Sequence, residues 1–174
     1  MSRLKSIPGG VNAPRGFLSA GIACGIKAKG RRDMAMLCSR RPAAAAGSFT
    51  TNRVQAAPVR LDRERVKKGL LQAVVVNSGV ANACTGSRGY SDAIETARLA
   101  GGFLGIAPAL IAVCSTGRIG PYLPMDRIRK GVEDLAGIVR RGGNPYAARA
   151  IMTTDTRPKE AAVEFWVGGK KVRV

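Results

Sequence analysis

Three short segments of the chain carry small, polar side chains of the kind that can hold or polarise a carbonyl group. They are Asn77-Ser78-Gly79-Val80-Ala81-Asn82-Ala83-Cys84-Thr85-Gly86, Ser115-Thr116-Gly117, and Met152-Thr153-Thr154-Asp155-Thr156-Arg157-Pro158-Lys159. A threonine hydroxyl beside a glycine N–H, as at Thr116 and Gly117, can donate two hydrogen bonds to one oxyanion without a buried charge. Each segment taken alone is also compatible with a loop or turn that serves only the fold.

The chain contains no histidine, which limits the chemistry it can perform alone. A Ser-His-Asp unit, a Cys-His unit and a histidine-bearing zinc site are all excluded for this chain by itself. Four widely spaced cysteines form no C-x-x-C pair, so we expect no metal site and interpret them as buried free thiols of a reducing compartment: Cys24, Cys38, Cys84 and Cys114. A base for catalysis must therefore be another kind of group or lie on another chain.

The composition is that of a globular protein with a strong positive charge. Hydrophobic residues make up 45% and charged residues 23%, and no apolar run approaches the roughly 20 residues that cross a bilayer. Pro8-Gly9-Gly10 stands where a signal peptide would be apolar. We therefore expect one domain over residues 1–174, in the cytoplasm and without a membrane partner.

The net charge of +18 raises the question of nucleic-acid binding. The 29 lysines and arginines are spread along the whole chain, and aromatic residues, at 5%, are too few for a platform that stacks single-stranded bases. We expect no nucleic-acid partner. Attraction to an acidic partner chain or to anionic substrates accounts for the charge as well.

Hydrophobic periodicity predicts the elements that position the three segments. Buried strands are expected over residues 71–76 and 110–114, directly before the first two segments. Helices are expected over 92–104 with Ser91 as N-cap, over 124–139, and over 144–150. Hairpins are expected at 21–27 with 33–38 and at 162–167 with 171–174, after an irregular stretch at 1–20. Short strands at 48–51 and 57–61 and a helical turn at 62–69 complete a mixed α/β, layered sheet-and-helix architecture.

Together the three segments resemble those of the ornithine acetyltransferases, also called glutamate N-acetyltransferases. The resemblance extends to the stretch from Gly16-Phe17 through Gly25-Ile26-Lys27, to Gly47-Ser48-Phe49-Thr50-Thr51-Asn52 and to Leu123-Pro124-Met125, in order along nearly the whole chain. Val80 is a departure, because members of that family commonly carry a polar residue there.

The resemblance implies that residues 1–174 are the α-chain part of a precursor that cuts itself before a threonine. That threonine would begin the β chain, beyond Val174, and its own α-amine would act as base, so no histidine is needed. The implied fold is the sheet-and-helix sandwich shared with N-terminal-nucleophile-like aminopeptidases. The implied assembly is an α2β2 heterotetramer.

The implied activity is ping-pong transfer of an acetyl group from N2-acetylornithine to glutamate, in arginine biosynthesis. No cofactor is implied, although some members accept acetyl-CoA as a donor. Thr116 and Gly117 match the family's oxyanion hole, Thr153 matches a substrate-binding threonine, and Thr154 is the neighbouring choice. Three other hypotheses stay open: a related aminopeptidase subunit, a basic nucleic-acid-binding module, and a purely structural subunit.

Overall fold

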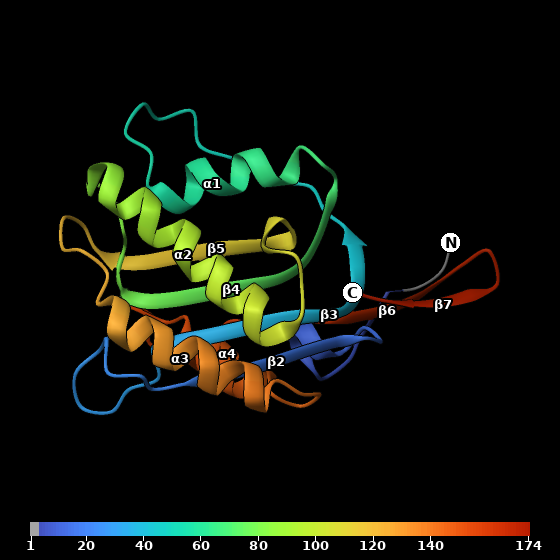
Figure 1. Ribbon diagram of the computed structural model, residues 1–174. Helices are drawn as coiled ribbons and strands as arrows, with labels where there is room; N and C mark the ends of the chain where they lie inside the picture. Colours follow the sequence, from blue (N-terminus) through green and yellow to red (C-terminus); the bar gives the residue numbers. More distant parts are fainter. Residues whose placement is uncertain (1–3) are drawn as a thin grey trace.

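The computed structural model describes residues 4–174, which form a four-stranded sheet and a separate three-stranded sheet (Figure 1). The strands of the larger sheet are β2 (Phe17–Ile22), β3 (Met34–Ala44), β4 (Leu70–Val80) and β5 (Ile111–Arg118), in that order across the sheet. Strands β4 and β5 are parallel, and the other neighbouring pairs are antiparallel. The smaller sheet has the order β1-β6-β7 and consists of β1 (Lys5–Ser6), β6 (Val163–Val167) and β7 (Lys170–Arg173).

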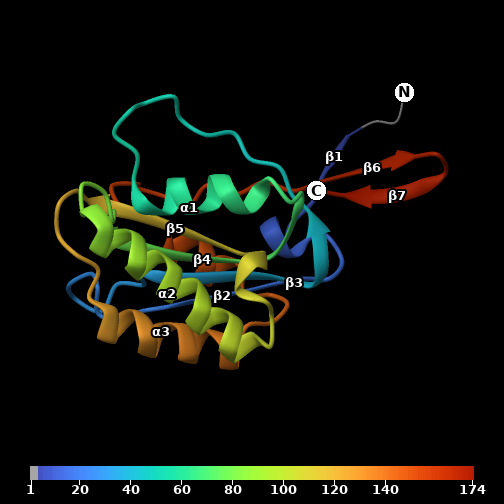
Figure 2. The ribbon, with the colours of Figure 1, turned by 45° about the horizontal axis from the view of Figure 1, so that its top comes forward.

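Helices cover both faces of the larger sheet. They are α1 (Ala57–Val66), α2 (Gly86–Leu104), α3 (Met125–Ile138) and α4 (Asn144–Ala150), with short 3₁₀ turns at Gly10–Asn12 and Pro108–Leu110. Helices α2 and α3 pack against each other on one face, α1 runs along the β5 edge, and α4 packs over β2 and β3 on the other face (Figure 2). The β6–β7 hairpin extends away from this body (Figure 1).

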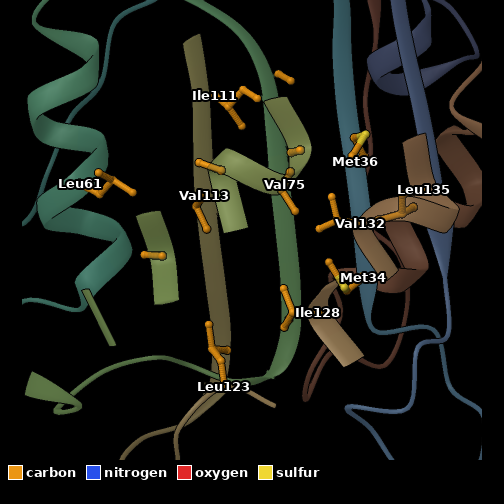
Figure 3. Packing of buried hydrophobic residues seen from close by; sticks show 14 of the residues in the cluster. Met34, Met36, Leu61, Val75, Ile111, Val113, Leu123, Ile128, Val132 and Leu135 are labelled. Atoms are coloured by element: carbon orange, nitrogen blue, oxygen red, sulfur yellow. The ribbon is translucent and has the colours of Figure 1, made fainter. Parts of the chain in front are cut away.

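The core lies between the larger sheet and the helices α1, α2 and α3 (Figure 3). Alternate residues of the strands point into it, as a pleated sheet requires, and residues at helical spacing on α3 meet them. The largest buried hydrophobic side chains are Met34 and Met36 of β3, Val75 of β4, Ile111 and Val113 of β5, and Ile128, Val132 and Leu135 of α3.

The intervening strand residues face the opposite side of the sheet. There Ala35 is fully buried against α4, whereas Val74 and Val76 are half-buried. Cys114 of β5 faces the same way and is solvent-exposed. This face of the sheet is therefore covered at β2 and β3 and open toward β5.

Most of the predicted elements are confirmed. The two strands before the polar segments, the two longer helices, the short helix α4 and the C-terminal hairpin are present, with shifted ends. The first hairpin is also present, but the strand predicted over residues 21–27 is wrong for residues 23–27, which form a loop after β2. Strand β4 continues through the start of the first polar segment, because Ser78–Val80 still pair with β5. Of the irregular stretch expected at 1–20, residues 1–3 lie outside the described part; the rest holds β1, a 3₁₀ turn and the first four residues of β2.

The strand predicted over residues 57–61 is wrong, because these residues begin helix α1. Its buried residues are Ala57, Pro58, Leu61 and Asp62, a helical rather than an alternating spacing. Proline is tolerated in the first turn of a helix, where its missing N–H would have had no partner. The short apolar run is compatible with the period of a helix and with that of a strand, and packing against β5 selects the helix.

The strand predicted over residues 48–51 is also wrong, because residues 45–56 form a loop. Here side chains bind the local backbone: Asn52 N–H donates to the Thr50 hydroxyl at 3.1 Å, and Val54 N–H donates to the Asn52 side-chain oxygen at 2.8 Å. Such local bonds offer the backbone an alternative to pairing in a sheet.

The N-cap predicted at Ser91 is wrong, since α2 begins at Gly86 and Ser91 lies inside it. The interpretation of the cysteines as buried thiols is correct for Cys38, but Cys24 is half-buried and Cys84 and Cys114 are exposed. No helix within residues 4–174 is long and apolar enough to cross a membrane.

Candidate active site

The first two polar segments meet at the carboxyl ends of the parallel strands β4 and β5. In the register of these strands Ser78 lies opposite Thr116 and Gly79 lies opposite Gly117. Neighbouring strands are about 4.8 Å apart, so the structure brings the two segments side by side. Thr116 is half-buried and shares the open face of the sheet with Ser78 and Cys114.

Gly117 occupies a position that only glycine can fill. Its φ is +134°, and a Cβ built on it would lie 2.3 Å from the carbonyl carbon of Gly79. Gly79 itself has a φ of +114°. The close approach of the Gly79 backbone therefore accounts for Gly117, and the left-handed φ accounts for Gly79.

The N–H of Gly117 points toward the outer edge of β5. On this strand Val113 N–H turns away from β4 and donates to the carboxylate of Asp62 in α1 at 3.0 Å. N–H groups two and four residues along a strand point the same way, so Gly117 N–H also faces the outer edge. The Thr116 hydroxyl forms no hydrogen bond with another group of residues 4–174. Both candidate oxyanion donors can thus reach a ligand.

The third segment is drawn to the same edge through the end of α4. The Ser78 hydroxyl donates to the carbonyl oxygen of Ala150, the last residue of that helix. Lys27 Nζ donates to the carbonyl oxygen of Met152 at 2.7 Å and to that of Ala150 at 3.4 Å. Thr153 follows Met152 directly and is half-buried. The structure therefore bonds the end of α4, three residues before Thr153, to Ser78.

Beyond Thr153 the third segment turns outward. Thr154 is exposed, and Thr153 N–H donates to Asp155 at 3.4 Å. Asp155 also forms a hydrogen-bonded ion pair with Lys159. The hydrogen bond from Lys159 is the larger cause, and the one from Thr153 the next, of the lowered pKa of the Asp155 carboxyl. Of the two threonines singled out from the sequence, Thr153 is the one that the fold draws inward.

Asp33 holds the site together and was missed in the sequence. It is fully buried; its carboxylate accepts hydrogen bonds from Cys24 N–H at 2.7 Å and Lys27 N–H at 2.9 Å, and its carbonyl oxygen accepts one from Ser78 N–H at 2.8 Å. Burial lowers the pKa of Lys27, although the nearby Asp33 acts against this shift. The sequence feature that could have indicated its role is a single acidic residue directly before an apolar strand.

The remaining polar side chains of the first segment serve the fold. Asn77 donates to the carbonyl oxygen of Val80 at 2.8 Å and accepts from Ser115 at 2.6 Å. Asn82 donates to the carbonyl oxygen of Gly89 at 2.8 Å and accepts from Thr85 at 2.8 Å, which joins the loop to α2. Val80, the departure from the family pattern, is buried in the core.

Residues 4–174 hold no group of three histidine, cysteine, aspartate or glutamate side chains close enough for a metal ion. Five aromatic rings are covered by cations of the chain itself, at 4.1–5.6 Å from ring centre to cation: Tyr146 by Arg32, Tyr90 by Arg60, Phe49 by Arg63, Tyr122 by Arg88 and Trp166 by Lys171. Each of these rings thus has a cation of the same chain over one of its faces.

Comparison with known proteins places the chain among close relatives. The model of the ArgJ family matches residues 18–174. Proteins named arginine biosynthesis bifunctional protein ArgJ are 54% identical in Symbiobacterium thermophilum, over 97% of this chain, and 44% identical in Thermosynechococcus vestitus, over 100% of it. The chain spans 42% of the length of each of these relatives.

Two solved structures match almost the whole fold. Arginine biosynthesis bifunctional protein ArgJ from Bacillus halodurans is 38% identical, with a TM-score of 0.96 over 100% of this chain and 92% of that chain. Ornithine acetyltransferase from Mycobacterium tuberculosis, solved with ornithine, is 42% identical, with a TM-score of 0.91 over 99% of this chain and 93% of that chain. The expected ornithine acetyltransferase type of sheet-and-helix fold is therefore confirmed. Since the family model covers most of the chain and these relatives share its sequence and its fold, this chain belongs to the ArgJ family.

Proposed function

We propose that this chain is the α part of an acyltransferase that moves the acetyl group of N2-acetylornithine to glutamate, in arginine biosynthesis. One observation carries the proposal: Ser78 pairs with Thr116, which sets the first two polar segments side by side, and Ser78 also bonds to Ala150, directly before the third segment. The Mycobacterium tuberculosis relative, an ornithine acetyltransferase solved in complex with ornithine, supports the substrate class.

In the proposed reaction the nucleophile is the N-terminal threonine of a second chain. Its hydroxyl attacks the acetyl carbonyl of N2-acetylornithine, and the oxygen of that carbonyl becomes an oxyanion held by the Thr116 hydroxyl and the Gly117 N–H. The intermediate collapses, the C–N bond breaks and ornithine leaves with a proton on its amine. The amine of glutamate then attacks the acetyl-threonine ester and restores the hydroxyl. Thr153 binds the substrate.

The lengths of the relatives support a separately folded second chain. This chain covers 42% of each curated relative named above but 92–93% of the matched chains in the two solved structures. The solved structures thus contain a chain that corresponds to this part of the longer protein. We propose that the longer protein cuts itself after this part and that two copies of each product form an α2β2 assembly.

The open half of the larger sheet supports the same proposal. Val74, Val76 and the exposed Cys114 lie on the face that α4 covers only at β2 and β3. A separate hollow of about 360 Å³ lies toward the start of β4, where apolar groups of β2, β3 and β4 line it, among them Leu37 and Val74. Apolar sheet faces are normally covered by another layer, and the second chain would supply that layer beside Thr116.

Two observations weigh against the other hypotheses. The low aromatic content and the dispersal of the cations along the chain disfavour nucleic-acid binding. The family match disfavours an aminopeptidase. A donor role for acetyl-CoA is a separate proposal and needs no further residue of this chain.

The experiment is an assay of the full-length protein with N2-acetylornithine and glutamate, in the absence of acetyl-CoA. We expect N-acetylglutamate and ornithine to form in equal amounts, and N-terminal sequencing to find a second chain that begins with threonine. Parallel assays measure hydrolysis of peptides and salt-dependent binding of duplex DNA. Peptide hydrolysis without acetyl transfer, or full activity of an uncut chain, would contradict the proposal.

A further inference from the structure

Lys27 connects the start of the third polar segment to the rest of the candidate site through hydrogen bonds. Its ammonium group donates to the carbonyl oxygens of Met152 and Ala150, at 2.7 and 3.4 Å. Ala150 is the last residue of α4, where helix carbonyls lack partners inside the helix and carry partial negative charge, and Met152 follows two residues later. Lys27 therefore fixes the backbone one residue before Thr153.

The backbone of Lys27 is itself held in place. Its N–H donates to the buried carboxylate of Asp33 at 2.9 Å, and Cys24 N–H donates to the other oxygen of that carboxylate. The carbonyl oxygen of Asp33 accepts from Ser78 N–H. The loop that carries Lys27 is thus bonded to β4 at the residue that pairs with Thr116.

The stem of Lys27 passes close to the glycine pair. A Cβ built on Gly79 would lie 3.1 Å from Lys27 Cγ, so the stem packs on the backbone of Gly79. Gly79 pairs with Gly117, the candidate oxyanion donor. One side chain therefore packs on Gly79 along its stem and bonds at its tip to the carbonyl of Met152, directly before Thr153.

We propose that Lys27 is a positioning residue for acyl transfer, which sets the place of Thr153 relative to the Thr116–Gly117 pair through the Met152 carbonyl. This inference rests on the proposed function. Lys27 does not touch the reacting atoms; it acts through the backbone that carries the substrate-binding threonine. A residue that only capped α4 would change the stability of the protein and leave the kinetic constants alone.

The test uses the full-length, processed protein with Lys27→Met, which keeps the apolar stem and removes the donors. The control is Lys68→Met, at an exposed lysine beyond the end of α1. We expect the KM for N2-acetylornithine to rise about tenfold, the size typical of losing a charged hydrogen bond, while kcat stays within about threefold. Amide hydrogen exchange of residues 151–155 should quicken in Lys27→Met alone, and Lys27→Arg should restore most of both properties.

The outcomes separate the inference from the function on which it rests. An unchanged KM together with unchanged exchange at residues 151–155 overturns the role of Lys27, even if the wild-type protein transfers acetyl groups. A wild-type protein without acetyl transfer refutes the proposed function, and exchange alone then decides whether Lys27 holds the segment. If Lys27→Met does not fold, Lys27→Gln, with a shorter neutral donor, takes its place and the same outcomes apply.

Discussion

Gly79 and Gly117 lie opposite each other at the ends of β4 and β5, and both have left-handed φ angles, +114° and +134°. A methyl group on Gly117 would overlap the Gly79 carbonyl carbon at 2.3 Å. We expect Gly117→Ala to lower the free energy of unfolding by about 3 kcal/mol or more, since backbone strain and overpacking each cost about 1–3 kcal/mol. Urea titration of the purified protein measures the change.

Gly120→Ala is the matched control for this prediction. Gly120 also has a left-handed φ, +103°, but a Cβ there meets no atom within 4 Å. Only the backbone strain remains, so Gly120→Ala should lower the free energy of unfolding by about 1 kcal/mol. Equal losses of unfolding free energy in Gly117→Ala and Gly120→Ala would show that close contact with Gly79 is not what excludes a larger residue at position 117.

A second pair of glycines, both in α2, differs in the same way. A Cβ on Gly89 would lie 1.9 Å from the Thr85 hydroxyl and 2.3 Å from the Asn82 side-chain oxygen, whereas one on Gly102 meets nothing within 4 Å. Gly89→Ala should break the bonds between the loop and the helix and destabilise the protein by about 1–3 kcal/mol. Gly102→Ala should stabilise it by up to about 1 kcal/mol through helix propensity. Thermal unfolding compares them; a stabilising Gly89→Ala would contradict the packing.

Asp62 gives a prediction for pH dependence. Burial raises its pKa to about 6, while its hydrogen bond from Val113 N–H and the nearby Arg65 act against the shift. The folded state therefore binds a proton more tightly than the unfolded state, and ionisation costs stability as the pH rises from about 4 through 6. Asp62→Asn, which keeps an acceptor for Val113, should stabilise the protein on the order of 2 kcal/mol above pH 6 and little at pH 4.

Asp134→Asn provides the comparison for Asp62, because Asp134 lies on the exposed side of α3 in an ion pair with Lys130. Such surface pairs contribute about 0–1 kcal/mol, so this variant should follow the wild-type protein across the pH range. A constant difference between Asp62→Asn and the wild type from pH 4 to 8 would rule out ionisation of Asp62 as the cause.

The sequence predicts the elements with a strong period of their own. Residues 125–138 carry a clear helical stripe, and the runs before Asn77 and Ser115 are apolar enough to mark strands. The prediction for residues 57–61 failed because a five-residue apolar run fits a strand or a helix, and contact with β5 decides. Local pattern therefore fixes long elements and leaves short ones to tertiary structure.

In the candidate site, too, the sequence predicts some features, whereas tertiary contacts decide others. The roles proposed for Thr116 and Thr153 come from the resemblance. The links made by Lys27 and Asp33 could not be predicted, because they end on backbone groups. The Lys27–Met152 bond, for example, spans 125 residues and ends on a carbonyl oxygen that every residue carries. Such bonds leave no pattern of side chains in the sequence.

The most direct test of the proposed site is the kinetics of Thr116→Ala in the full-length, processed protein. A donor that acts mainly on the oxyanion contributes more in the transition state than in the ground state. We expect kcat for acetyl transfer from N2-acetylornithine to glutamate to fall by about 10²–10³, with little change in KM, and Thr116→Ser to retain most of the activity. Precursor cleavage, which also passes through an oxyanion, should slow as well. A stable, fully processed Thr116→Ala protein with the kcat of the wild type would contradict the account.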